Sequence, residues 1–224
     1  MKKIFILYDI LYEMYGPQGW WPLLKHGGYH IKDYTLPKSD DEIFEVCLGA
    51  ILTQNTTFTS VVKSLKNLEE LGALSVDGIK KLPIDVLKNA IRPSGYFNQK
   101  SRYILEFVDF FESLKGVPAR ESLLRVVGIG EETADSILLY AYKQEQFVVD
   151  AYTKRIFFYL GIIDEKASYK DVKSLVEETF TKYVESKSEL YVVYQEFHAL
   201  LVAHAKKYYS KKPHGVGCPL VEKL

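Results

Sequence analysis

Apolar residues recur every three or four positions along most of the chain, which is the spacing of one face of an α-helix. Strands would instead show alternating apolar and polar positions, and such alternation is almost absent from the sequence. The pattern therefore predicts an all-α fold. The clearest apolar stripes lie at residues 43–52, 61–71, 104–114, 172–183 and 190–204.

Start and stop signals accompany these stripes. The segment Ser39-Asp40-Asp41-Glu42 has the spacing of a capping box, so a helix is expected to begin there. Gly72 is the predicted end of the second helix. The third is expected to end near Gly116 and Pro118, because proline cannot continue a helix. Connections are short except for the polar, turn-rich stretch 27–41, which is the predicted crossing between domains.

The composition is that of a folded protein. Hydrophobic residues make up 47% and aromatic residues 14% of the 224 positions, which is enough for a sizeable core and excludes a disordered chain. No apolar run approaches the roughly 20 residues of a membrane span, and the N-terminal segment reaches Asp9 before a secretory core could form. We therefore expect a soluble, cytoplasmic protein with no membrane partner.

Charge and cysteine content do not indicate a function by themselves. The 29 basic residues balance 29 acidic ones, so no global field attracts nucleic acid. The basic run at 206–214, taken alone, favours a solvated tail. The two cysteines, Cys47 and Cys218, do not support a disulfide framework, and Cys47 is expected in the core. The histidines lack the spacing and companion ligands of a metal site, so no metal is expected.

The first segment with chemical content is 123–138, where a short helix is expected to enter Gly128-Ile129-Gly130 and a second helix to leave it. The glycines permit a tight reversal and close approach by a ligand. The N–H groups at the start of the second helix have no partner within it, so they can donate to a phosphate. Taken alone, the pattern favours an ordinary helix-helix turn, because Gly-x-Gly is common in such turns.

A carboxylate follows the hairpin. The apolar run Phe147-Val148-Val149 leads to Asp150, which is the predicted N-cap of another helix. N–H donors and the helix dipole stabilise an ionised carboxylate at such a position. Its role is either capping alone or, beside a hairpin that grips DNA, stabilisation of positive charge developing on a deoxyribose ring as the base departs.

These segments together resemble the helix-hairpin-helix DNA glycosylases, and specifically the endonuclease III branch. The resemblance covers most of the chain. It rests on four ordered segments: Leu48–Thr56, Arg92–Lys100, Gly128–Gly130 and Val149-Asp150. It implies a two-lobed all-α fold with the active-site cleft between the lobes. The expected lobes are a central helical barrel at 41–146, with the helix-hairpin-helix at about 121–142, and a second helical domain formed by 1–40 plus 147–224.

The resemblance also implies roles for individual residues. The expected partner is double-stranded DNA containing a damaged base, whose nucleotide such enzymes take out of the stack. By resemblance, Gly128 and Gly130 bind the DNA backbone, Gln54 fills the gap left in the duplex, and Asp150 is the catalytic carboxylate. Whether the hairpin also binds a monovalent cation stays open. The protein is expected to act as a monomer in a prokaryotic-type cytoplasm, associated with the nucleoid.

One departure from the branch concerns the nucleophile. Bifunctional members carry a lysine that attacks the sugar and leads to strand cleavage. At the corresponding position, 18 residues before Asp150, this chain has Glu132, and the neighbouring Glu131 supplies no amine either. We therefore predict a monofunctional glycosylase that hydrolyses the base-sugar bond, leaves an abasic site and lacks strong lyase activity, with Glu132 at the base pocket.

A second departure concerns the C-terminal region, where the branch often holds an iron-sulfur cluster with four cysteines. One thiol in four cannot hold such a cluster, so none is expected. Lys211 and Lys212 in the same loop are expected to contact DNA phosphates instead. The four corresponding positions here are Tyr208, Gly215, Cys218 and Leu224.

The substrate is expected to depend on the segment Trp20-Trp21-Pro22. With Phe58 after the Leu-Thr-Gln-Asn-Thr run, it resembles the 3-methyladenine DNA glycosylase III type. By that resemblance Trp20 and Phe58 sandwich the flipped base, while Trp21 and Pro22 line its pocket. Anchoring of the N-terminal segment in the core is the alternative interpretation of the two tryptophans.

An alkylated purine such as 3-methyladenine fits these aromatic residues, because alkylation of a ring nitrogen makes the base cationic and π faces attract cations. A cationic base is also an activated leaving group. Two alternatives stay open: a glycosylase for oxidised or mismatched bases, and a noncatalytic module that binds damaged DNA.

Overall fold

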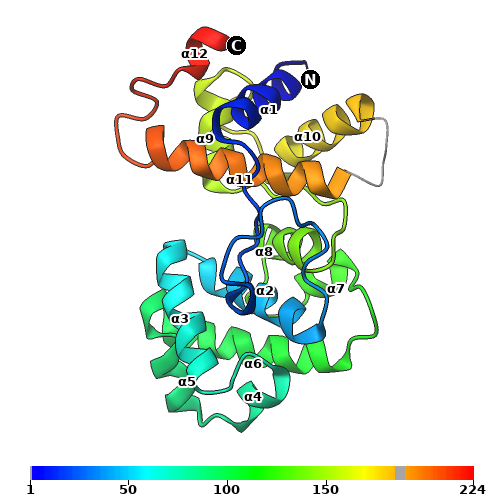
Figure 1. Ribbon diagram of the computed structural model, residues 1–224, viewed down its shortest axis with the longest axis vertical. Coiled ribbons are helices and arrows are strands. Elements are labelled where there is room, and N and C mark those ends of the chain that lie inside the picture. The colour runs from blue at the N-terminus through cyan, green and yellow to red at the C-terminus, as the bar shows by residue number, and fades with distance from the viewer. Residues whose placement is uncertain (1, 185–189) are drawn as a thin grey trace. The chain divides into compact units, whose positions relative to one another are not determined.

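The computed structural model describes residues 2–184 and 190–224 (Figure 1). Within these ranges the regular structure is helical, apart from an isolated antiparallel bridge between Leu23 and Gly28. The predicted all-α class is confirmed. No helix in the described ranges is long and apolar enough to cross a membrane.

The chain divides into two compact units. We call Met1–Trp20, Tyr29–Tyr34 and Lys143–Leu224 the terminal unit, and Trp21–Gly28 and Thr35–Tyr142 the central unit. The division differs from the predicted boundaries, because the segment that begins at Trp21 packs within the central unit.

The central unit is built around one buried helix, α2 (Asp40–Thr53), in which every residue from Phe44 to Leu52 is buried. Ser39 forms the predicted capping box with Glu42. Around α2 pack α3 (Phe58–Glu70), α6 (Phe97–Ser113), α8 (Glu131–Ser136) and the π-helical turn η3 (Ile137–Ala141). The remaining elements of this unit are η1 (Leu24–His26), α4 (Val76–Lys81), α5 (Ile84–Ala90), η2 (Arg92–Ser94) and α7 (Arg120–Leu124).

The terminal unit is built around α11 (Leu190–Tyr208), which packs against α1 (Lys2–Tyr15) and α9 (Ala151–Tyr159) (Figure 1). Its core is aromatic: the ring of Phe197 lies 5.4 to 5.7 Å from those of Tyr8, Phe147 and Phe180. Such rings bury large apolar area and fix the positions of the helices. The unit also contains α10 (Tyr169–Tyr183) and α12 (Leu220–Lys223).

Candidate active site

The predicted helix-hairpin-helix is formed by α7, a glycine turn, and α8 continued by η3. Gly128 has a φ of +87°, and a Cβ atom built there would lie 2.2 Å from Cγ of Tyr103. Gly130 has extended backbone with open space around its Cα. The turn therefore requires glycine at Gly128, for its backbone conformation and for the close approach of Tyr103.

An ion pair joins the two helices of the hairpin. The guanidinium of Arg120 on α7 donates to both carboxylate oxygens of Asp135 on α8, at 2.7 and 3.0 Å. Asp135 is fully buried, and such a two-bond pair fixes orientation as well as distance. Glu131 and Glu132, in the first turn of α8, are both exposed. The hairpin is thus rigid, and its second helix begins with two carboxylates and no lysine.

Gln54, at the C-terminal end of α2, is bound to the hairpin. Its side-chain nitrogen donates to the carbonyl oxygen of Gly128 at 2.9 Å and to the hydroxyl of Thr133 at 3.2 Å. The sequence did not suggest this contact, because it joins segments far apart in the chain. Insertion of Gln54 into a duplex stays a prediction, and it would require these bonds to break.

The end of α2 is fixed by a buried lysine. The ammonium of Lys100 donates to the carbonyl oxygens of Leu52 and Ser94 at 2.7 and 2.8 Å, and the residue is 2% exposed. Burial lowers its pKa to about 8. Lys100 belongs to the Arg92–Lys100 segment noted in the sequence, but its contact with the turn that carries Gln54 was not predicted.

Trp21 and Pro22 are buried in the central unit. The Trp21 ring meets those of Phe58 and Tyr140 edge-on, with centroids 5.6 and 5.3 Å apart. A Cβ atom on Gly49 would lie 2.9 Å from the Trp21 indole nitrogen, so this glycine leaves room for the ring. Trp21 therefore anchors its segment in the core, as the alternative interpretation held, and pocket lining by Trp21 and Pro22 stays a prediction.

Asp150 is the N-cap of α9, as predicted. Its Oδ1 accepts hydrogen bonds from the backbone N–H of Thr153 at 2.7 Å and from the hydroxyl of Thr153 at 2.8 Å. Its Oδ2 lies 3.9 Å from Nε2 of His198 on α11, beyond hydrogen-bond distance. One carboxylate oxygen is therefore committed to capping, whereas the other faces an imidazole that sequence reasoning had left without a role.

The imidazole of His198 is buried, and burial lowers its pKa against the opposing effect of Asp150. The ring is therefore neutral at physiological pH. A neutral imidazole carries no positive charge, so it does not neutralise the carboxylate of Asp150, whose Oδ2 can stabilise a cation that forms nearby.

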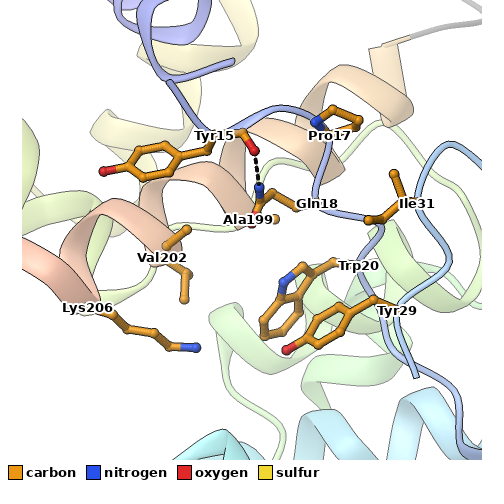
Figure 2. Close-up of a pocket in the computed structure, with 10 residues that line it drawn as sticks. Tyr15, Pro17, Gln18, Trp20, Tyr29, Ile31, Ala199, Val202 and Lys206 are labelled. Atoms are coloured by element: carbon orange, nitrogen blue, oxygen red, sulfur yellow. Dashed lines mark hydrogen bonds between the residues drawn. The ribbon is translucent and has the colours of Figure 1, made fainter. Parts of the chain in front are cut away.

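Trp20 lines a pocket of about 500 Å³ in the terminal unit (Figure 2). Its ring lies 5.8 Å from that of Tyr29, and the ammonium of Lys206 lies 5.7 Å from its centroid. The other residues around the pocket include Tyr15, Gln18 and Val202. Such a volume accommodates an aromatic base.

A buried carboxylate holds the loop before Trp20. Glu196 on α11 is 2% exposed and accepts hydrogen bonds from the N–H groups of Gln18 and Gly19, at 2.7 and 3.3 Å, and from the hydroxyl of Tyr34 at 3.1 Å. Three donors satisfy this buried charge. The loop is therefore positioned by a residue distant in sequence, which no local motif indicated.

The predicted base-binding residues fall in both units. Trp20 belongs to the terminal unit, and Phe58 belongs to the central unit with Trp21 and Pro22. Their predicted sandwich of a flipped base stays a prediction.

The C-terminal loop has an aromatic core in place of thiolates. Cys218 is buried, and its sulfur accepts a hydrogen bond from the hydroxyl of Tyr209 at 3.3 Å and lies 3.2 Å from Nε2 of His204. This donor set does not fit a four-thiolate iron-sulfur cluster. No group of three His, Cys, Asp or Glu residues in the described ranges is placed to hold a metal. Lys211 and Lys212 are exposed, and their contacts with phosphate stay predictions.

The hairpin and the Asp that follows it define a class of DNA repair protein. Residues 48–182 match the family described as "HhH-GPD superfamily base excision DNA repair protein", and the chain belongs to that superfamily. It is a base excision repair DNA glycosylase that is similar to endonuclease III.

Two curated relatives support this conclusion. The "Putative DNA repair glycosylase MJ1434" of Methanocaldococcus jannaschii is 38% identical over 99% of this chain and 95% of its own length. Endonuclease III of Sulfolobus acidocaldarius is 31% identical over 76% of each protein.

Solved structures agree with the fold. The 3-methyladenine DNA glycosylase MagIII of H. pylori, bound to 1,N6-ethenoadenine, is 31% identical with a TM-score of 0.66 over 73% of this chain and 85% of its own. An endonuclease III trapped as a covalent intermediate with DNA has a TM-score of 0.73 over 99% of this chain and 93% of its own, at 20% identity. The predicted two-domain helix-hairpin-helix fold is confirmed.

Proposed function

We propose that the protein is a monofunctional glycosylase that removes an alkylated purine, such as 3-methyladenine, from double-stranded DNA. The observation that carries the proposal is the arrangement around Asp150, where one oxygen is fixed by Thr153 and the other faces a neutral imidazole. Glu132 at the position of the branch's lysine supports hydrolysis over covalent attack. The similarity to a 3-methyladenine DNA glycosylase supports the substrate class.

In the proposed reaction the damaged nucleotide leaves the stack and its base stacks on Trp20. The bond between C1′ and the base nitrogen breaks, and the electron pair goes to the base. An alkylated purine that was cationic departs neutral, so it needs no protonation. The sugar develops positive charge, which Oδ2 of Asp150 stabilises. Water adds to C1′ and loses a proton, which leaves an abasic site.

The test is the release of 3-methyladenine from methylated duplex DNA by the wild type and by Asp150→Asn. Asparagine is also a good N-cap, so this variant is expected to fold. Loss of a preorganised charge predicts a rate lower by about 100-fold. The matched control is Asp171→Asn, which alters another capping aspartate of the terminal unit and is expected to leave the rate unchanged. Equal release by the wild type and Asp150→Asn would refute the role of Asp150.

A second measurement tests the monofunctional mechanism. Borohydride reduces a Schiff base to a stable amine, so a lysine nucleophile would leave a covalent protein-DNA adduct. We expect no adduct with the wild type. The substrate class is tested separately with duplexes that carry single alkylated, oxidised or mismatched bases. Preferred release of an oxidised or mismatched base would favour the alternative, and binding without release would favour a noncatalytic module.

A further inference from the structure

The imidazole of His198 faces the carboxylate of Asp150 at a distance too long for a direct hydrogen bond. Nε2 of His198 lies 3.9 Å from Oδ2 of Asp150, and the two side chains are 8% and 14% exposed. Hydrogen bonds of about 2.8 Å from one water to both atoms would meet at roughly 90° across this distance, near the angle between the two O–H bonds. The pair therefore has the spacing to hold one water between two acceptors.

Aromatic packing fixes the imidazole relative to the carboxylate. Phe197 precedes His198 on α11. The Phe197 ring lies 5.7 Å from that of Phe147, three residues before Asp150, and 6.2 Å from that of Phe157 on α9. Groups held in this way can orient a water for attack before the reaction begins.

The proposed reaction needs a proton acceptor, because the water that adds to C1′ must lose a proton. A neutral imidazole is the commonest general base in proteins, and in its Nδ1–H tautomer His198 presents a lone pair at Nε2. Burial lowers the pKa of His198 and the charge of Asp150 raises it, so an imidazolium formed beside this carboxylate is stabilised as an ion pair. The carboxylate of Glu196, on the same helix, already accepts hydrogen bonds from three donors.

We propose that His198 is the general base of the reaction and that it holds the nucleophilic water together with Asp150. This inference rests on the proposed function. The water donates one hydrogen to Oδ2 of Asp150 and the other to Nε2 of His198, so a lone pair of its oxygen is free to face C1′.

The electrons and the proton of this step balance. The bond between C1′ and the base nitrogen breaks, and its electron pair leaves with the base. The water oxygen forms a bond to C1′ as its proton passes to Nε2 of His198, and the electron pair of the broken O–H bond stays on the oxygen. The imidazolium then returns the proton to solvent, which restores the neutral ring.

The expected effect follows from the role of the water. Until water adds to C1′, the departed base can recombine with the sugar, so slow addition lowers net release. A positioned general base contributes about 100-fold or more to a rate. We therefore expect His198→Gln and His198→Ala to release base about 100-fold more slowly than the wild type, with little change in affinity for the damaged duplex.

The experiment measures release of 3-methyladenine from methylated duplex DNA in a single turnover, with the protein in excess. The wild type, His198→Gln, His198→Ala and His204→Gln are compared at about pH 8, where free imidazole is mostly neutral. Each rate is measured with and without added imidazole. Circular dichroism and the dissociation constant for the duplex show which variants fold and bind.

Imidazole rescue separates a base from a structural residue. Added imidazole is expected to restore release by His198→Ala, because the shortened side chain leaves room for the ring, and to have no effect on His198→Gln. His204→Gln is the matched control: it removes another buried imidazole of α11, whose nitrogens face Tyr15 and Cys218. It is expected to keep the wild-type rate with and without imidazole.

A folded His198 variant that releases base at the wild-type rate would overturn the inference. A slow His198→Ala that binds the duplex but is not restored by imidazole would overturn it as well. If the wild type releases no base, or if Asp150→Asn releases it as fast as the wild type, the proposed function fails instead. The two failures are therefore distinguishable.

Discussion

Substitution of Gly128 by alanine tests how the hairpin is built. The residue has a φ of +87°, a region that costs an L-residue roughly 1 kcal/mol or more. The new Cβ atom would also lie 2.2 to 2.4 Å from three ring atoms of Tyr103, where ordinary contacts are about 3.5 to 4.0 Å. The ring must move, and such overpacking costs about 1 to 3 kcal/mol. We therefore expect Gly128→Ala to lower the free energy of unfolding by about 2 to 4 kcal/mol.

Gly130→Ala is the matched control within the same turn. Its φ is −92° and no atom lies within 4 Å of the new Cβ, so only its role as N-cap of α8 is affected. The expected cost is less than about 1 kcal/mol. Both variants are compared with the wild type by urea denaturation monitored by circular dichroism, with equal m-values as the sign of an unchanged unfolding transition.

A double-mutant cycle separates the two causes of the Gly128→Ala effect. In a Tyr103→Ala background the ring is absent, so Gly128→Ala should cost only the backbone term of roughly 1 kcal/mol. If Gly128→Ala is as stable as Gly130→Ala, or if its cost is the same with and without the Tyr103 ring, the reasoning is wrong.

Three further substitutions test buried ionisable groups. Burial lowers the pKa of His204 to about 4 from 6.5, so the unfolded chain gains a proton first as the pH falls. The free energy of unfolding should therefore drop by roughly 2 kcal/mol between pH 6.5 and pH 4. His204→Gln should flatten this pH dependence, measured by urea titrations. The pKa of Lys100 is about 8 instead of 10.5, so the free energy of unfolding should rise with pH between these two values. Lys100→Met should abolish this rise. It should also cost about 2 kcal/mol at pH 7, because two carbonyl oxygens lose their donor. Glu196→Gln replaces the carboxylate that holds the loop before Trp20 with an amide. Affinity for a lesion duplex, measured by fluorescence anisotropy, should weaken about tenfold. Unchanged affinity would contradict a positioning role for Glu196.

The sequence determined the elements whose causes are local. Helical periodicity, the capping box at Ser39 and the N-cap at Asp150 depend on residues three or four positions apart, and the structure has all three. Glycine at Gly128 was also predictable, because the turn between two helices requires an unusual backbone conformation there. The sequence alone also shows that Glu132 stands where bifunctional members of the branch carry a lysine.

Tertiary structure decided which side chains meet. Trp20 and Trp21 are adjacent in the sequence and chemically identical, yet Trp21 is 5% exposed in the core of the central unit and Trp20 lines a pocket of the terminal unit. The contacts of Asp150 with His198 and of Trp20 with Lys206 join segments distant in the chain. Local patterns cannot supply such contacts, because the positions of packed helices depend on the summed burial of many side chains along α11 and its neighbours.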